Sequence, residues 1–108
     1  SGVIELTLGG GNLATVAPVA GVFQNLGTLT INNQFATATS VVLVSIEQKI
    51  DDGVAPSPQQ AEFFVDVDNR TSGTFDIRVG MIPTAMNVSN YSTSDKIRVG
   101  YTIINAGR

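Results

Sequence analysis

The fold of this chain is decided by one stretch, Phe63 to Gly80, which reads FFVDVDNRTSGTFDIRVG. Apolar and polar residues alternate on both sides of its centre, which is the period-two pattern of strands with one buried and one solvated face. The centre, Asn69 to Gly73, has the composition of a hairpin connection, with a glycine where a positive φ is needed. The stretch therefore predicts two strands joined by a short turn.

Further strands are predicted on both sides of this hairpin. Three segments alternate in the same way: Val3 to Leu8, Leu26 to Ile31 and Lys96 to Ile104. The run Ser40 to Lys49 has a VVLV centre that is apolar on both faces, which indicates a central strand covered on both sides. Valine, isoleucine and threonine are abundant throughout, and β-branched residues favour strands over helices.

The remaining segments are typical of loops and of an arm. Ile50 to Gln60 and Met81 to Asp95 are long and polar, and they contain many turn-forming residues. Asn12 to Asn25 is rich in alanine, valine and glycine and contains Pro18, which favours an extended arm over a long strand. We therefore expect an all-β protein: a single antiparallel β-sandwich, jelly-roll or Ig-like, with residues 1–25 as strand and arm and residues 26–108 as the sandwich domain.

The composition excludes several kinds of chemistry. The 108 residues, enough for one domain, include no histidine, cysteine or tryptophan. An imidazole base, a thiolate nucleophile and the soft ligands of zinc are therefore absent. Because no catalytic set of carboxylates is apparent either, we expect that the protein is not an enzyme and has no catalytic residue, bound metal or cofactor.

The charge pattern bears on the partners. Only 14% of the residues are charged, against 43% hydrophobic, and the net charge is -3. A surface so poor in charge favours self-association, since large exposed apolar patches are rare on monomers. An acidic chain is a poor ligand for a phosphate backbone, and no run of about 20 apolar residues is present, so we expect neither a nucleic acid nor a membrane as partner.

The two long loops hold the candidate binding residues, which are Asp51, Asp52, Asn87, Asn90 and Tyr91. Turn chemistry is the ordinary explanation for Asp51 and Asp52. Asn87 and Asn90 lie in glycosylation triplets (NVS and NYS), which a chain rich in Asn, Ser and Thr also produces by chance. Tyr91, in a polar loop, is the one aromatic candidate for stacking on a sugar, although an ordinary structural role is the favoured interpretation. The five phenylalanines, Phe23, Phe35, Phe63, Phe64 and Phe75, are expected in the core. Asp66 and Asp68 resemble the start of a calcium loop, but strand alternation places them on the solvent face.

A charged patch follows from an internal similarity. The segments FDIRVG, from Phe75, and DKIRVG, from Asp95, are alike. If these two strands pair, their outward residues form one patch, made of Asp76, Arg78, Lys96 and Arg98. Such a patch is either an ordinary solvated surface or a contact between subunits.

Three segments together resemble the small β-sandwich modules of tailed-phage virions: NLGTLTINNQFATATSVVLVSIEQ, FFVDVDNRTSGTFDIRVG and KIRVGYTIINAG. Such modules occur at fibre tips and in capsid decoration (cement) proteins, and the resemblance covers Leu26 to Gly107. H-type lectins are similar to a lesser degree, with a comparable strand and turn. The chain lacks the histidine and tryptophan residues common near their sugar sites.

The resemblance implies a function and partners. It implies a homotrimeric capsid decoration protein on the capsid exterior, which stabilises the phage head by bridging copies of the major capsid protein or another virion protein. The stretch Gly9 to Gly27 would then be an arm that reaches a neighbouring subunit. The alternative is a receptor- or glycan-binding fibre-tip or lectin-like module, whose two long loops would bind a glycan of the host surface.

Overall fold

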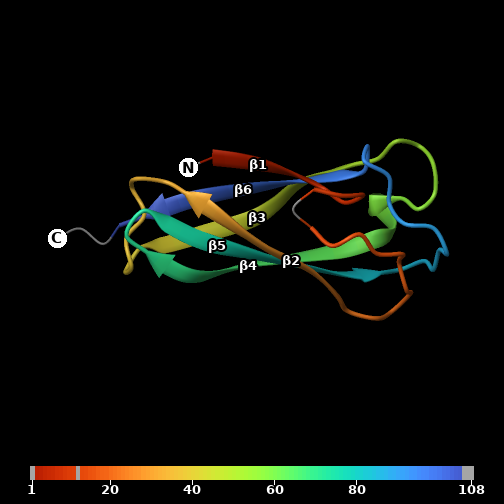
Figure 1. The fold of residues 1–108 in the computed structure, drawn as a ribbon, viewed down its shortest axis with the longest axis horizontal. Helices are drawn as coiled ribbons and strands as arrows, with labels where there is room; N and C mark the ends of the chain where they lie inside the picture. The colour runs from red at the N-terminus through yellow and green to blue at the C-terminus, as the bar shows by residue number, and fades with distance from the viewer. Residues whose placement is uncertain (1, 12, 106–108) are drawn as a thin grey trace.

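A computed structural model describes residues 2–11 and 13–105 of the chain. These residues form six strands and one short 3-10 helix: β1 (Gly2–Thr7), β2 (Gln24–Asn32), β3 (Val41–Ile50), η1 (Pro58–Gln60), β4 (Ala61–Thr71), β5 (Thr74–Pro83) and β6 (Lys96–Ile104). The strands make two antiparallel three-stranded sheets, in the orders β1-β6-β3 and β2-β5-β4 (Figure 1). The all-β fold and the small β-sandwich predicted from the sequence are confirmed.

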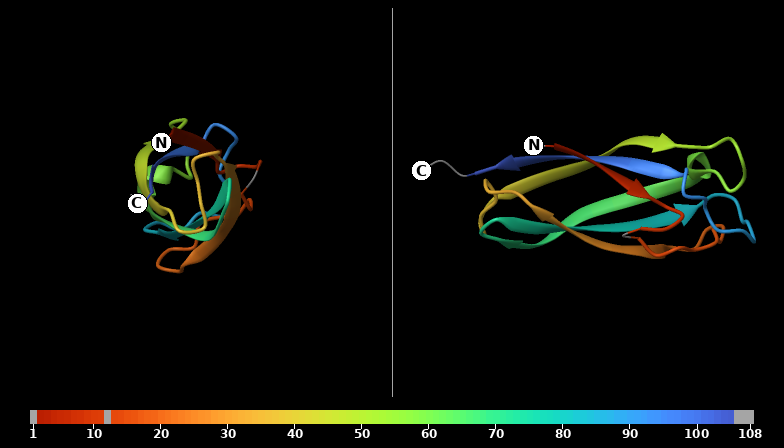
Figure 2. Two further views of the ribbon diagram at one scale, coloured as in Figure 1. Left: turned by 90° about the vertical axis from the view of Figure 1, so that its left-hand side faces the viewer. Right: turned by 45° about the horizontal axis from the view of Figure 1, so that its top comes forward.

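The core lies between the two sheets, which curve around it when the molecule is viewed from its end (Figure 2). Its centre is formed by the inward side chains of β5, each at most 1% exposed: Phe75, Ile77, Val79 and Met81. Burying one such side chain contributes about 1.5 to 3 kcal/mol to folding. The alternation also holds on β2, where Leu29 and Ile31 pack against the core and Thr28 and Thr30 are exposed.

The hairpin predicted in the deciding stretch joins β4 to β5, with Thr71 opposite Thr74. Asn69, with a φ of 48°, and Gly73, with a φ of 94°, take the positive values that this connection requires. The Lys49 ammonium donates to the Ala61 carbonyl at 2.7 Å, and the Arg70 guanidinium donates to the Ser40 carbonyl at 3.0 Å. These bonds connect the β3 side of one sheet to β4 of the other.

The two similar strands lie in different sheets. β5 pairs with β2 and β4, whereas β6 pairs with β1 and β3. Asp76 and Arg78 therefore lie on one outer face of the sandwich, and Lys96 and Arg98 lie on the opposite one. The prediction of a single charged patch made of these four residues is wrong, because alternation identifies the outward residues of a strand but not the sheet to which the strand belongs.

β3 is an edge strand and not a central one. Its residues Val42, Val44 and Ile46 pack against the core, as the alternation requires. Val41 and Leu43 point to the other side and are 49% and 55% exposed. The prediction that the VVLV run is covered on both sides is therefore wrong for the single chain, which covers the inner side alone.

The segment before β2 lies against its own sandwich. Leu13 is 4% exposed, and the amide of Ala14 donates to the Leu26 carbonyl at 2.8 Å. Farther along, the Gly21 amide donates to the Pro83 carbonyl at 2.8 Å. The described part of this segment contains no strand, as expected of an arm, but it lies against β2 and β5 of its own chain. In the part of the chain that the structure describes, no helix is long and apolar enough to cross a membrane.

Candidate functional site

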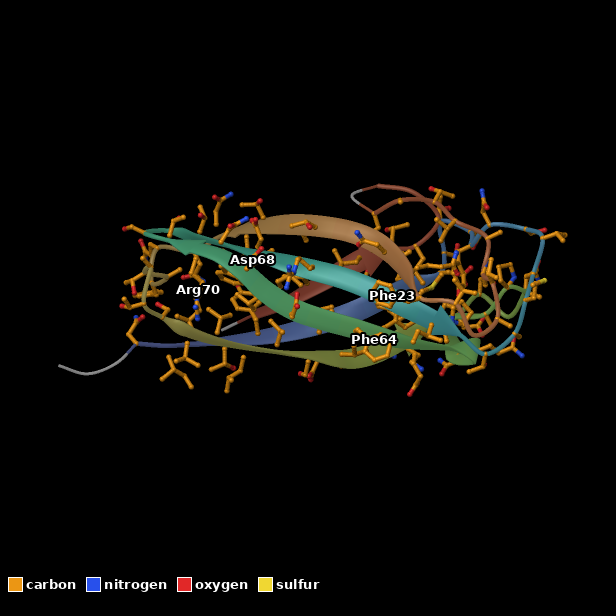
Figure 3. The ribbon with its side chains drawn as sticks, turned by 90° about the horizontal axis from the view of Figure 1, so that it is seen from below. Phe23, Phe64, Asp68 and Arg70 are labelled. Carbon is orange, nitrogen blue, oxygen red and sulfur yellow. The ribbon has the colours of Figure 1, made fainter. Side chains whose placement is uncertain are left out.

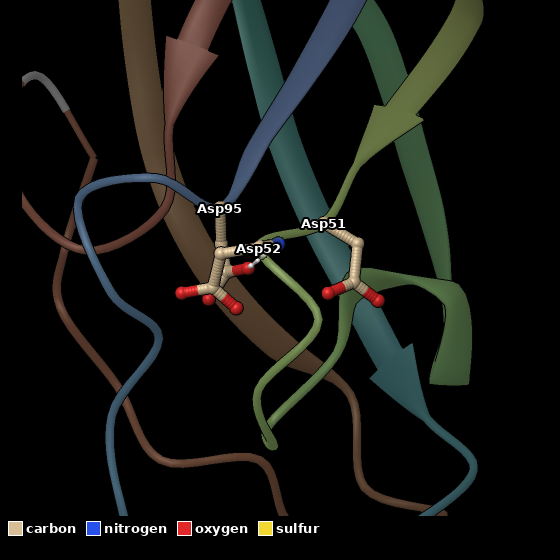
Figure 4. Close-up of side chains that lie close together, drawn as sticks. All are labelled: Asp51, Asp52 and Asp95. Atoms are coloured by element: carbon tan, nitrogen blue, oxygen red, sulfur yellow. Dashed lines mark hydrogen bonds between the residues drawn. The ribbon is translucent and has the colours of Figure 1, made fainter.

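Two of the predicted loop residues, Asp51 and Asp52, come together with a third carboxylate, Asp95, which was not among the candidates predicted from the sequence. Asp51 and Asp52 follow β3, and Asp95 directly precedes β6 (Figure 4). One carboxylate oxygen from each lies within 4.8 Å of the others. Oxygen ligands at this spacing are of the kind that hard cations prefer.

The Asp51 carboxylate is occupied within its own loop. It accepts a hydrogen bond from the Gly53 amide at 2.6 Å and another from the Ser57 hydroxyl. Ser57 is also the N-cap of η1, where its hydroxyl accepts from the Gln59 amide at 3.1 Å. Asp51 therefore holds the start of its loop to the turn before β4.

Asp52 and Asp95 connect the two long loops. The Ser92 hydroxyl donates to Asp52 at 2.6 Å, and this bond, with one from the Val54 amide, lowers the pKa of Asp52. Asp95 is 1% exposed and accepts hydrogen bonds from the Ser92 amide at 2.9 Å and the Asp52 amide at 3.4 Å. These hydrogen bonds link the two long loops, so the carboxylate cluster is explained by a structural role.

The other loop candidates differ in their exposure. Asn90 is exposed. The backbone amide of Asn87 donates to the Pro18 carbonyl at 3.1 Å. Tyr91 is 3% exposed, and its hydroxyl donates to the Met81 sulfur at 3.8 Å. Burial, followed by the negative charge of Asp95, raises the pKa of Tyr91 to about 12. The ring of Tyr91 is part of the core, so Tyr91 is not a residue that stacks on a sugar, and the favoured interpretation of a structural role is the correct one.

Exposed aromatic rings lie instead on the outer face of the β2-β5-β4 sheet. Phe23 is 57% exposed and Phe64 is 49% exposed, and their ring centroids are 6.3 Å apart (Figure 3). The core assignment holds for Phe75, at 0% exposed, and for Phe63, which packs against the core, but it is wrong for Phe23, Phe64 and the 64% exposed Phe35. One signal was in the sequence: Phe63 and Phe64 are neighbours on a strand, so their side chains point to opposite faces.

These two rings flank a groove of about 520 Å³. Its lining residues are Phe23, Asn25, Phe64, Val65, Asp66, Arg78, Val79 and Gly80. A Cβ atom on Gly80 would lie 2.3 Å from the Phe23 ring, so the absence of a side chain lets this ring approach the β5 backbone. We name this site the Phe23–Phe64 groove.

A paired acid and base form the polar side of the groove. The Arg78 Nε donates to Asp66 Oδ1 at 2.7 Å, and Nη2 donates to Oδ2 at 2.6 Å. This bidentate contact lowers the pKa of Asp66 and raises that of Arg78. On the same face, Asp76 accepts hydrogen bonds from the Thr30 hydroxyl at 2.7 Å and from the side-chain Nδ2 of Asn69 at 2.9 Å.

The outer face of the β1-β6-β3 sheet has a polar and an apolar part. At the polar part, Lys96 and Arg98 each lie 3.4 Å from the Glu5 carboxylate. Exposed ion pairs of this kind contribute at most about 1 kcal/mol. The apolar part, here named the aliphatic patch, consists of Val3, Val41, Leu43 and Ile104, with the exposed Thr102 among them, opposite Leu43.

Comparisons of the chain with protein-family models, with curated proteins and with solved structures find no match.

Proposed function

We propose that this chain is a structural protein of a tailed-phage virion, a homotrimeric capsid decoration protein that bridges capsid subunits on the exterior of the head. The aliphatic patch is the observation that carries the proposal. The resemblance to modules of tailed-phage virions supports the choice of a phage head as the particle. The proposed role requires no catalytic turnover.

The patch has the composition of an interface core. Its four side chains are between 46% and 63% exposed, and the strand register places Val41 directly opposite Ile104. Completing the burial of one of them against another chain contributes about 1 kcal/mol, which is half the value for full burial. Contact with another copy would also cover the outer side of the VVLV run, which its own chain leaves open.

The residues beside the aliphatic patch are of the kind that forms the rim of a protein interface. Glu5, Lys96 and Arg98 lie on the same face, toward the other end of β6. Apolar centres with polar, solvent-accessible edges are characteristic of stable interfaces between proteins. A second copy is thus favoured over a nucleic acid or a lipid surface, neither of which complements an aliphatic patch beside a mixed-charge cluster.

The first test is the mass of the protein in solution, measured by light scattering during gel filtration. We expect a trimer for the natural chain and a monomer for Leu43→Glu. Because Leu43 points to solvent in the single chain, the substitution should change the stability of the isolated subunit by at most about 0.5 kcal/mol. Val88→Glu is the matched control, since Val88 is 96% exposed in the loop before β6. A natural chain that is monomeric at all concentrations would contradict the proposal.

The second test is binding to capsids that lack a decoration protein. We expect the trimer to sediment with them at a fixed copy ratio to the major capsid protein and to raise the temperature at which they release DNA. Leu43→Glu should do neither, whereas Val88→Glu should do both. A trimer without capsid affinity would refute the decoration role while leaving the self-association intact.

A further inference from the structure

The Phe23–Phe64 groove is a small apolar site on a polar face. Most of the other outward residues of this sheet are polar or charged, among them Thr28, Thr30, Asp68 and Asp76, whereas Ile82 is apolar. Interface centres between proteins are depleted of charged residues, so this face is a poor core for a protein contact. Its volume of about 520 Å³ instead lies within the range of small-molecule sites.

The polar groups of the groove are held in place. The two hydrogen bonds between Arg78 and Asp66 fix the guanidinium and the carboxylate in one plane, as a fork-to-fork pair requires. Asn25 is anchored by the Gly27 amide, which donates to its Oδ1 at 3.1 Å. Among the described residues its Nδ2 has no hydrogen-bond partner, so it can donate to a ligand.

Aromatic rings beside fixed donors and acceptors complement one kind of ligand in particular. A pyranose ring has an apolar face of C–H groups, which packs on an aromatic ring, and an edge of hydroxyls, which donate and accept hydrogen bonds. Phe23 and Phe64 offer the aromatic surface, and Asn25, Asp66 and Arg78 offer the polar contacts.

The local charge selects among sugars. Asp66 and Arg78 neutralise each other, and Asp68, whose carboxylate lies 3.6 Å from Arg78, adds a negative charge beside the groove. Asp76, on the same face, adds another, and the chain as a whole carries a net charge of -3. An anionic sugar would meet repulsion here. We propose that the Phe23–Phe64 groove is a binding site for a neutral carbohydrate, independent of the aliphatic patch on the opposite face.

The test is a glycan array that includes neutral hexoses, N-acetylhexosamines and deoxyhexoses together with uronic and sialic acids. The best neutral glycan is then titrated into isotopically labelled protein and followed by NMR. We expect binding to a neutral glycan with shifts of the Gly80 and Phe64 amide signals. Binding of acidic glycans alone, or of no glycan on the array, would overturn the proposal.

Two alanine substitutions locate the site. Phe64→Ala should weaken the binding at least tenfold, because it removes one aromatic surface, whereas Phe64→Tyr should retain it. Phe35→Ala is the matched control, since Phe35 is another exposed phenylalanine, 64% accessible and outside the groove. Thermal unfolding of each variant shows that it is folded. Equal affinity of Phe64→Ala and the natural chain, or equal losses in Phe64→Ala and Phe35→Ala, would overturn the assignment.

Discussion

Replacing Tyr91 by phenylalanine should remove a loss of stability that the natural protein shows at alkaline pH. The folded protein holds the Tyr91 hydroxyl away from water, and its pKa is raised from 10.0 to about 12. Above pH 10 the unfolded chain therefore loses this proton while the folded chain keeps it, so the free energy of unfolding falls as the pH rises. The stabilisation is complete below the unfolded pKa and is lost as the pH passes toward the folded one.

The size of this effect follows from the shift. Two pKa units at 1.36 kcal/mol each amount to about 3 kcal/mol between pH 10 and pH 12. Near neutral pH, Tyr91→Phe should cost less than about 1 kcal/mol, because the lost hydrogen bond is a long one to sulfur. The two lysines and Tyr101 are present in both proteins, so the difference between the natural chain and the variant isolates Tyr91.

The assay is guanidinium chloride unfolding of both proteins at a series of pH values up to 12, with the ultraviolet absorbance of tyrosinate recorded in parallel. We expect the natural chain to lose its advantage and become the less stable protein as Tyr91 is forced to ionise. A stability difference that stays constant through this range, or a Tyr91 that titrates near pH 10, would mean that the ring is solvated, and would refute the burial described above.

Two further predictions concern packing on the outer face and at the loops. Gly80→Ala should destabilise the protein by about 1 to 3 kcal/mol, because the new Cβ would lie 2.3 Å from the Phe23 ring, and denaturant unfolding should show most of this cost relieved in a Phe23→Ala background. Equal costs in both backgrounds would contradict the contact. Asp95→Ala should cost about 1 to 3 kcal/mol, because the Ser92 and Asp52 amides lose their acceptor, and hydrogen exchange should become faster at both amides. An unchanged rate of hydrogen exchange at the Asp52 amide would contradict the hydrogen bond between the two loops.

Local alternation was sufficient to predict the strands and their inward faces. The segment Lys96 to Ile104 coincides with β6, and the outward positions of Thr28 and Thr30 on β2 and of Asp66 and Asp68 on β4 follow from period two alone. These features could be predicted because a strand has one geometric repeat, and each residue's side of the sheet follows from it.

Long-range pairing and loop packing could not be predicted in this way. Nothing in FDIRVG or KIRVG specifies that one strand joins β2 and β4 while the other joins β1 and β3. The residues around Tyr91 are polar and show no periodic pattern. Its burial beside Met81 therefore depends on how the whole loop packs against the core. Phe23 is exposed because Gly80, far along the chain, leaves room for its ring on the outer face.

The pairing of β1 with β6 has a consequence for how the protein is made. Thr7 pairs with Lys96, so β1 leaves the ribosome long before its partner and cannot enter its sheet until β6 has been synthesised. The β4–β5 hairpin, whose partners are adjacent in sequence, can form much earlier. Until β6 arrives, Ile4 and Leu6 have no sheet in which to be buried, and the nascent chain is exposed to aggregation through this strand.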